Sequence, residues 1–438
     1  MPTAPNTLEH HWMPFTANRD FKANPRILVE GNGVWFTDHH GQKILDGSSA
    51  LFCSAAGHAR PEIAQAVHDQ LLKLDYTTSF QLGHPASFEL ARAVAALMPE
   101  AINHVFFANS GSEAIDTAMK IVMAYHDARG ENGRNRFVSR ERAYHGVNIG
   151  GLSLSGLPNN RKAFGGVIPG VLFLRHTWLE DNRFSRGQPE TGAELADDLA
   201  RFVDEHGADA IAACFIEPVA GSTGCLVPPK GYLERIREIC DEAGILLIFD
   251  EVICGFGRLG APFSMEAFGV EPDMVTMAKA LTNGAIPMGA VAVRDDIYET
   301  IVEAAPAGTV ELFHGYTYSA HPAACAAGLA ALEIYQKENL FERAARLSDP
   351  FLDAVFGLAD VELISDIRGI GLIAGFDVAA GEQPGARGAD LQKRLFANGL
   401  HIKFTGDTGI IAPPLVSDET HIDQLVAIVR ATIAEMPI

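Results

Sequence analysis

The sequence has no long apolar run, and basic residues are scarce. A membrane-spanning helix needs ~18 consecutive apolar residues, and the 438 residues contain no such run, so we expect no membrane span. Lys and Arg number 34 against 55 Asp and Glu, which leaves a formal net charge of −21. An acidic surface of this kind argues against nucleic acid or anionic lipid as a partner.

Paired cysteines are also missing. The six cysteines are scattered without a C-x-x-C motif, and several lie in apolar stretches, which is typical of reduced, buried thiols in a cytosolic protein. Residues 1–5 show no basic region followed by an apolar one, so we expect no secretory signal and a cytoplasmic location. The cysteines are Cys53, Cys214, Cys225, Cys240, Cys254 and Cys325.

Short apolar runs alternate with helix-like stretches along the middle of the chain. This alternation predicts an α/β fold with a mainly parallel sheet and helices on both of its faces. The expected strands are 104–107, 136–139, 151–154, 171–174, 211–216, 245–249, 274–277 and 288–293. The expected helices are 61–74, 86–98, 111–129 and 231–243.

The two ends of the chain have a different character. Residues 26–46 alternate in hydropathy with glycine-containing turns, which predicts a small antiparallel meander. Strands at 361–364 and 371–376, with helices over 320–337, 339–356, 387–397 and 420–434, indicate a smaller α+β domain. We therefore expect an N-terminal segment, 1–60, that packs with a C-terminal small domain, 318–438, and a large domain, 61–317, between them.

Two apolar strands each end in a charged residue, and the two end residues have opposite charges. Residues 245–249 form an uninterrupted apolar run that stops at Asp250, and residues 275–278 lead to Lys279. Ligands of parallel sheets collect at the carboxyl ends of the strands. A buried lysine with apolar flanks has a depressed pKa and suits Schiff-base chemistry, although a single lysine is more often a surface residue.

Other strand ends carry groups that complement this pair. Ser110, Gly111 and Ser112 join a strand to a helix and could seat a phosphate, or simply cap the helix. Tyr144 could lie against a planar ligand, and Glu217 could cap its strand. An acid, a lysine, a phosphate seat and an aromatic ring at one sheet edge are the groups that pyridoxal phosphate (PLP) requires.

Longer motifs extend along nearly the whole chain in order. They are residues 109–114, 144–146, 217–221, 249–258, 279–284 and 315–322. Together they resemble class III (ω-) aminotransferases of fold type I. The runs 20–26, 145–149 and 285–291 are most similar to ω-amino acid:pyruvate (β-alanine:pyruvate) aminotransferases.

The resemblance implies a role for each matching residue. Lys279 would form the Schiff base with PLP and shuttle the proton, and Asp250 would keep the pyridine nitrogen protonated. Thr317 would reach the phosphate of a neighbouring subunit, which implies a homodimer with shared active sites and leaves a tetramer open. Phosphate and ring contacts are implied for Ser110, Gly111, Ser112, Tyr144, His145, Glu217 and Val252, and substrate contacts for Phe52, Phe80, Tyr144 and Lys403.

Lys403 departs from the family pattern, in which an arginine binds the substrate carboxylate. A lysine offers a point charge in place of a planar fork, so it either substitutes adequately or shifts the donor preference. The implied reaction is a ping-pong transfer of the amino group from an ω-amino acid or primary amine, such as β-alanine, to pyruvate. A taurine- or polyamine-specific transaminase, or an aminomutase, remains open as the alternative.

Overall fold

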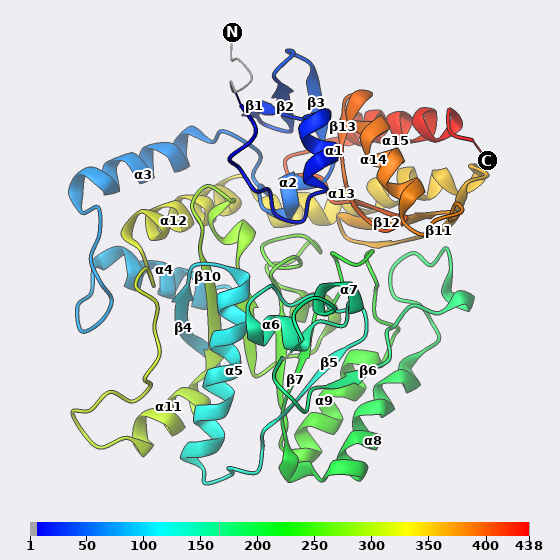
Figure 1. Ribbon diagram of the computed structural model, residues 1–438. Coiled ribbons are helices and arrows are strands. Elements are labelled where there is room, and N and C mark those ends of the chain that lie inside the picture. Colours follow the sequence, from blue (N-terminus) through cyan, green and yellow to red (C-terminus); the bar gives the residue numbers. More distant parts are fainter. Residues whose placement is uncertain (1–6, 166, 438) are drawn as a thin grey trace.

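A seven-stranded sheet forms the centre of the computed structural model, which describes residues 7–165 and 167–437 (Figure 1). The strand order is β4-β10-β9-β8-β7-β5-β6. Strand β10 is antiparallel to β4 and β9, and the neighbours from β9 to β6 pair in parallel, which confirms the mainly parallel sheet. The strands are β4 (Ile102–Ala108), β5 (Arg136–Arg140), β6 (Leu172–Leu174), β7 (Ile211–Ile216), β8 (Leu246–Asp250), β9 (Met274–Met277) and β10 (Gly289–Arg294).

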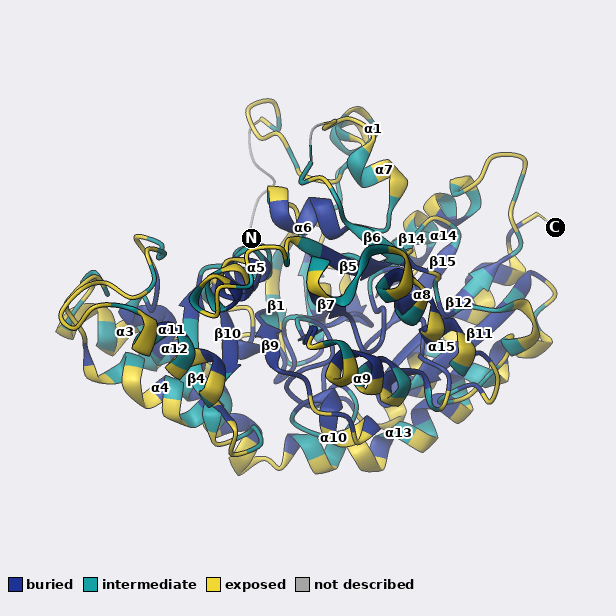
Figure 2. Ribbon diagram, turned by 90° about the horizontal axis from the view of Figure 1, so that it is seen from below, coloured by how far each residue is buried: buried dark blue, intermediate teal, exposed yellow. Residues whose placement is uncertain are grey.

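Both faces of this sheet are covered, so its central strands β7, β8 and β9 are buried at every position. Successive residues of β8 belong to opposite cores, since side chains alternate across a strand. Ile248 packs in the cluster that contains Ile115 of helix α5 (Gly111–Ala128). Phe249 belongs to the cluster that contains Ile236 of α9 (Tyr232–Ala243). All residues of β7 and β8 are buried, and Figure 2 shows the sheet interior in dark blue.

The prediction of a strand at 151–154 is wrong. These residues belong to helix α6 (Ile149–Leu154), which packs on α5. A Cβ atom on Gly150 would lie 2.3 Å from Asp116 Oδ1, and one on Gly151 would lie 2.2 Å from the carbonyl oxygen of His145. Close packing on these neighbours favours the helix over a strand. The predicted strand at 361–364 is displaced, because β11 spans Ile364–Ile370.

The N-terminal meander joins the C-terminal part of the chain in one sheet, of order β1-β2-β3-β13. Its strands are β1 (Leu28–Asn32), β2 (Trp35–Asp38) and β3 (Lys43–Asp46), and β13 (Leu400–His401) pairs with β3 in parallel. A third sheet has the order β11-β12-β15-β14, with β12 (Ile373–Val378), β14 (Lys403–Thr405) and β15 (Thr408–Ile411). We propose the boundaries near residues 60 and 317 as the division between the large domain and the small one.

Helices surround these sheets (Figure 1). The first half of the chain contributes α1 (Asn18–Ala23), α2 (Ser49–Phe52), α3 (Pro61–Lys73), α4 (Pro85–Ala95), α7 (Pro158–Arg161) and α8 (Asp197–His206). The second half contributes α10 (Ser264–Phe268), α11 (Asp295–Ala304), α12 (Pro322–Lys337), α13 (Leu340–Phe356), α14 (Ala386–Ala397) and α15 (Glu419–Ala434). Short 3-10 turns lie at Glu180–Asn182, Ala193–Ala196, Ala208–Ala210, Lys279–Thr282 and Gly357–Asp360.

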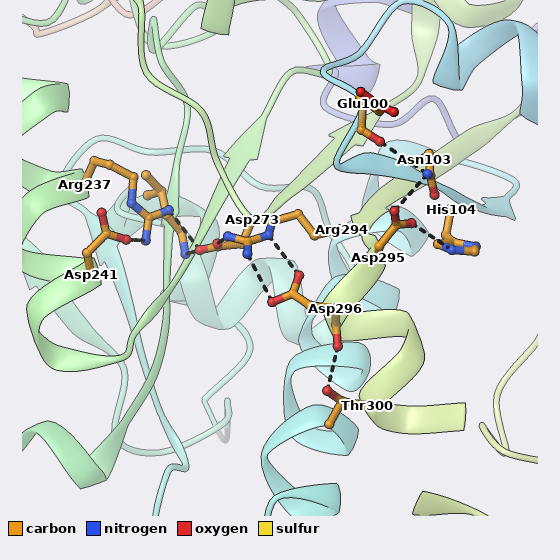
Figure 3. A network of polar contacts seen from close by, with 11 residues as sticks. Glu100, Asn103, His104, Arg237, Asp241, Asp273, Arg294, Asp295, Asp296 and Thr300 are labelled. Carbon is orange, nitrogen blue, oxygen red and sulfur yellow. Dashed lines mark hydrogen bonds and ion pairs between the residues drawn. The ribbon is translucent and has the colours of Figure 1, made fainter. Parts of the chain in front are cut away.

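A buried polar network ties three strands together at the sheet edge opposite to Asp250 (Figure 3). Asp273 accepts hydrogen bonds from Arg237 Nη1 at 2.9 Å, from Arg294 Nη1 at 2.8 Å and from the backbone N–H of Leu247 at 2.7 Å. These partners belong to α9, β10 and β8. The carboxylate therefore holds the relative positions of the strands that carry the site at their other end.

The cysteines are free thiols, and Cys53 is the member of the set that is not fully buried. None of the helices within residues 7–165 and 167–437 is long and apolar enough to cross a membrane. Residues 1–5, from which we expect no secretory signal, lie outside the described residues.

Candidate active site

A cavity opens where the carboxyl ends of β7, β8 and β9 meet the N-terminus of α5. It brings together Asp250 and Lys279, which the sequence predicted as the chemical pair. The residues that line it are Gly111, Ser112, Tyr144, His145, Gly146, Glu217, Asp250, Val252, Ile253, Ala278 and Lys279. Parallel strands place their carboxyl ends at one sheet edge, which is why these distant residues meet.

Asp250 is buried and oriented from two sides. His145 Nδ1 lies 2.7 Å from Asp250 Oδ2, and the backbone N–H of Val252 donates to Oδ1 at 3.1 Å. The bond to the carboxylate places the His145 proton on Nδ1. Because a carboxylate accepts more than one hydrogen bond at each oxygen, Asp250 can still accept one from a protonated ring nitrogen.

Lys279 follows β9 in a strained turn and is half-buried. Its φ angle is +49°, in the left-handed region that non-glycine residues avoid, which is common at functional sites. Burial lowers the pKa of Lys279, because a low-dielectric surrounding disfavours the charged amine. Lys279 Nζ lies 5.7 Å from the centroid of the Phe52 ring, so Phe52, predicted as a substrate contact, lies beside the amine.

The N-terminus of α5 has the geometry of an anion seat. Ser110 is the N-cap, and its hydroxyl accepts from the backbone N–H of Glu113. The first N–H groups of a helix have no intrahelical acceptor and favour an anion. Ser112 Oγ accepts from Val147 N at 3.0 Å, while Gly146, with φ at +99°, packs so closely that a Cβ atom would lie 2.4 Å from Ser112 Oγ.

Tyr144, Val252 and Glu217 complete the lining. The backbone N–H of Tyr144 donates to Glu217 Oε1 at 2.9 Å. Burial raises the pKa of Glu217 to about 7, so this carboxyl changes charge near neutral pH. Tyr144 and Val252 border the same cavity as Lys279 and Asp250, where a planar ring would find an aromatic surface and an aliphatic one.

Lys403 extends the site toward the small domain. It lies on β14, is half-buried, and its Nζ donates to Thr405 Oγ1 at 2.7 Å. Burial and then the charge of Lys279 lower the pKa of Lys403 to about 8. The charge of Lys279 acts on Lys403, so the two amines lie close enough to belong to one site.

Phe80 and Thr317 lie away from the cavity in a single chain. Both are exposed, and they lie on neighbouring loops: the Phe80 ring packs on Gly315, and Tyr76 Oη donates to the carbonyl of Thr317 at 2.8 Å. The site predictions for these two residues remain predictions.

Some cavity residues were not predicted from the sequence, and one glycine motif in the sequence is misleading. Ile253, Ala278 and Gly146 line the cavity, and their position next to predicted site residues was the available signal. Gly255, Gly257 and Gly260 spell the dinucleotide pattern G-x-G-x-x-G. These glycines lie in turns, where added Cβ atoms would meet the carbonyl of Glu251, the ring of Phe341 and the backbone of Ala345. Because they do not join a strand directly to a helix, they do not form a pyrophosphate seat.

The donor set fits PLP. An anion seat, a carboxylate for the pyridine nitrogen and an amine of lowered pKa surround one cavity. Gly146 lines the same cavity, and its lack of a side chain leaves space beside Ser112. The fold and this set of groups define a PLP-dependent enzyme of fold type I.

Comparison with known proteins gives the family. The model of the class-III aminotransferases matches residues 16–433. The chain is 50% identical over 433 residues to an omega-aminotransferase of Caulobacter vibrioides, covering 98% of each chain. It is 47% identical to a beta-alanine–pyruvate aminotransferase of Pseudomonas aeruginosa, over 95% of this chain and 94% of that protein.

A solved structure agrees with the sequence relatives. The omega transaminase of Pseudomonas jessenii in complex with PMP superimposes with a TM-score of 0.91 at 31% identity, over 97% of this chain and 96% of that one. The chain belongs to the class-III aminotransferase family, and its cofactor is PLP. This confirms the resemblance seen in the sequence.

Proposed function

We propose that this aminotransferase moves the amino group of an ω-amino acid or primary amine, such as β-alanine, to pyruvate. The observation that carries this proposal is a second amine, that of Lys403, close enough to Lys279 for the charge of Lys279 to lower its pKa. A donor with its amine at one end and its carboxylate at the other has a partner for each end. The names of the relatives described above support the same choice of donor and acceptor.

PLP, when bound, supplies an aldehyde that condenses with amines and a ring that withdraws electrons from the carbon bearing the amine. Lys279, whose lowered pKa provides a neutral amine, holds the aldehyde and then moves a proton to and from that carbon. Asp250 keeps the ring nitrogen protonated, and His145 orients the carboxylate. The α5 N-terminus, with Gly111 and Ser112, holds the phosphate.

The remaining residues position the two substrates. Tyr144 and Val252 border the faces of the ring, Glu217 shares the cavity, and Phe52 packs beside Lys279. Lys403 binds the carboxylate of the donor or of pyruvate. Because donor and acceptor use one pocket, the first product leaves before pyruvate enters, and ping-pong kinetics follow.

We further propose a homodimer with shared active sites. Large apolar side chains are exposed on the loops around residues 76–88 and 310–318, among them Phe80, Phe313 and Tyr318. An apolar surface of this kind is typical of a protein interface. Pairing of two copies there would bury these side chains, bring Phe80 to the substrate pocket, and bring Thr317 to the phosphate of the other subunit. Free cysteines without pairs support a cytoplasmic location.

A donor panel with pyruvate as acceptor tests the proposal. Purified enzyme with PLP should be yellow and should lose that colour when β-alanine is added, and alanine should accumulate once pyruvate follows. Taurine and putrescine in the same panel distinguish the alternative transaminases, and a product isomeric with the donor would reveal an aminomutase. Failure of every ω-amino acid and amine to yield alanine would refute the proposal.

A further inference from the structure

A chain of hydrogen bonds fixes the ammonium group of Lys403. Lys403 Nζ donates to Thr405 Oγ1 at 2.7 Å, and Thr405 Oγ1 donates to the carbonyl of Ser222, also at 2.7 Å. Lys403 and Thr405 are two residues apart on β14, so their side chains point to the same face of the strand. Ser222 belongs to the loop that follows β7, which brings a large-domain backbone group to this small-domain strand.

The three acceptors around the ammonium are unequal. The contacts of Lys403 Nζ with the carbonyls of Ser222 and Phe404 are both 3.4 Å, far longer than the 2.7 Å bond to Thr405. Charge-assisted bonds weaken steeply with distance, so Thr405 is the strong partner and the two carbonyls are weak ones. The hydroxyl of Thr405 donates its single proton to the carbonyl of Ser222. Its oxygen therefore acts as the acceptor for Lys403.

This inequality has a consequence for substrate choice. An ammonium has three protons, and Thr405 binds one of them firmly. A donor carboxylate can replace the two weak carbonyl contacts without displacing the lysine. When the donor has no carboxylate, the carbonyls of Ser222 and Phe404 keep the charge solvated by the protein.

We propose that Thr405 is a positioning residue for carboxylate donors: it holds Lys403 in place to bind the carboxylate, and keeps it there when the donor has none. The proposal rests on the role of Lys403 in the proposed function. A planar arginine fork would need matching acceptors in its plane, whereas a lysine fixed at one bond exchanges the others freely. The same site then accepts ω-amino acids and uncharged amines without a swing of the cationic side chain.

The charge of Lys403 depends on this arrangement. Burial, and after it the positive charge that Lys279 carries when protonated, lowers the pKa of Lys403 to about 8. Loss of the Thr405 hydroxyl removes the strongest acceptor for the ammonium, so the pKa should fall further. Binding of a carboxylate donor should then weaken at a lower pH than in the parent enzyme.

Kinetics of Thr405→Val and Thr405→Ser with two donors test the proposal. β-Alanine and propylamine share the amine and the carbon chain length but differ in the carboxylate. With pyruvate as acceptor, Thr405→Val should raise the KM for β-alanine about tenfold, as expected for one lost bond to a charged group. Its kcat and the KM for propylamine should stay within about twofold, and the upper limb of the pH profile for β-alanine should move to lower pH. Thr405→Ser, which keeps the hydroxyl, should restore parent values.

Lys403→Met provides the second arm. In the Lys403→Met background, Thr405→Val should have no further effect on the KM for β-alanine, because the two changes remove the same interaction. An effect that persists there, or an equal rise in KM for both donors, would show that Thr405 has only a structural role. If Lys403→Met keeps the parent KM for β-alanine, the role of Lys403 in the proposed function fails. If Lys403→Met raises that KM and Thr405→Val does not, the positioning role alone fails.

Discussion

Replacement of Gly146 by alanine should separate cofactor affinity from general stability. Gly146 has φ at +99°, and a Cβ atom there would lie 2.4 Å from Ser112 Oγ, 2.8 Å from Ser112 Cα and 2.9 Å from Ser112 Cβ. Two of these three atoms cannot rotate away, so the backbone at the start of α5 must shift. That shift moves Ser112 in the seat proposed for the phosphate.

The size of the effect follows from the bonds at risk. A hydrogen bond to a charged group contributes about 1.5–3 kcal/mol. Loss of one such bond to the phosphate corresponds to a rise in the Kd for PLP of about 10- to 150-fold. The left-handed backbone adds a cost of about 1–2 kcal/mol for alanine, which lowers the stability of the folded chain as well.

Gly231→Ala is the matched control. Gly231 also has a left-handed backbone, with φ at +81°, but the nearest atom to an added Cβ is Ala193 Cβ at an ordinary 3.5 Å. In urea unfolding of the apoenzyme, followed by circular dichroism, Gly231→Ala should lose the cost of the left-handed backbone, and Gly146→Ala should lose at least as much. Equilibrium dialysis against PLP should show weaker binding for Gly146→Ala alone. Equal PLP affinity in the two variants would refute the proposed phosphate seat.

Other outcomes follow from the same structure. Asp273→Ala should lower the free energy of unfolding by about 3 kcal/mol, because it leaves the buried backbone N–H of Leu247 without its acceptor (Figure 3). Asp296→Ala removes an exposed partner of the same Arg294 and should lower the free energy of unfolding by under about 1 kcal/mol. Equal urea midpoints of the two variants would contradict this prediction. Lys279→Ala should reduce turnover by at least about 10²-fold and should no longer be linked covalently to PLP by borohydride, and a variant that borohydride still links to PLP would exclude Lys279 as the attachment point. Lys403 is protonated below its pKa of about 8 and neutral above it. The KM for β-alanine divided by the KM for propylamine should therefore rise about tenfold between pH 7 and pH 9. A constant ratio would disprove a contact between the Lys403 ammonium and the donor carboxylate.

The large domain was predictable because its signals are local. The central parallel strands are short apolar runs, and β8 ends in the residue that lines the cavity, with Phe249 before Asp250. Residues 151–154 misled for the same reason. Their apolar alternation suggests a strand, but these residues form a helix in which Gly150 and Gly151 pack closely on their neighbours. The pattern of residues 151–154 by itself does not reveal this packing.

The small domain was less predictable, since its pairings join residues far apart in the chain. Strand β13 pairs with β3 across more than half of the protein, and neither strand shows its partner in its own residue pattern. Phe80 and Thr317 show a second limit, because the structure of one chain does not test their predicted roles. The predicted role of Thr317 depends on a second copy, and Phe80 would reach the pocket in the proposed dimer, whereas one folded chain leaves both side chains at its surface.

Residue order alone was enough to identify the family and its cofactor, through motifs that resemble class III aminotransferases. It also predicted that Asp250 and Lys279 lie at one sheet edge, because the carboxyl ends of parallel strands meet there. Folding was needed to bring Ser222, from the large domain, to the hydroxyl of Thr405 beside Lys403. A contact between two domains depends on how they pack, and no local pattern encodes it.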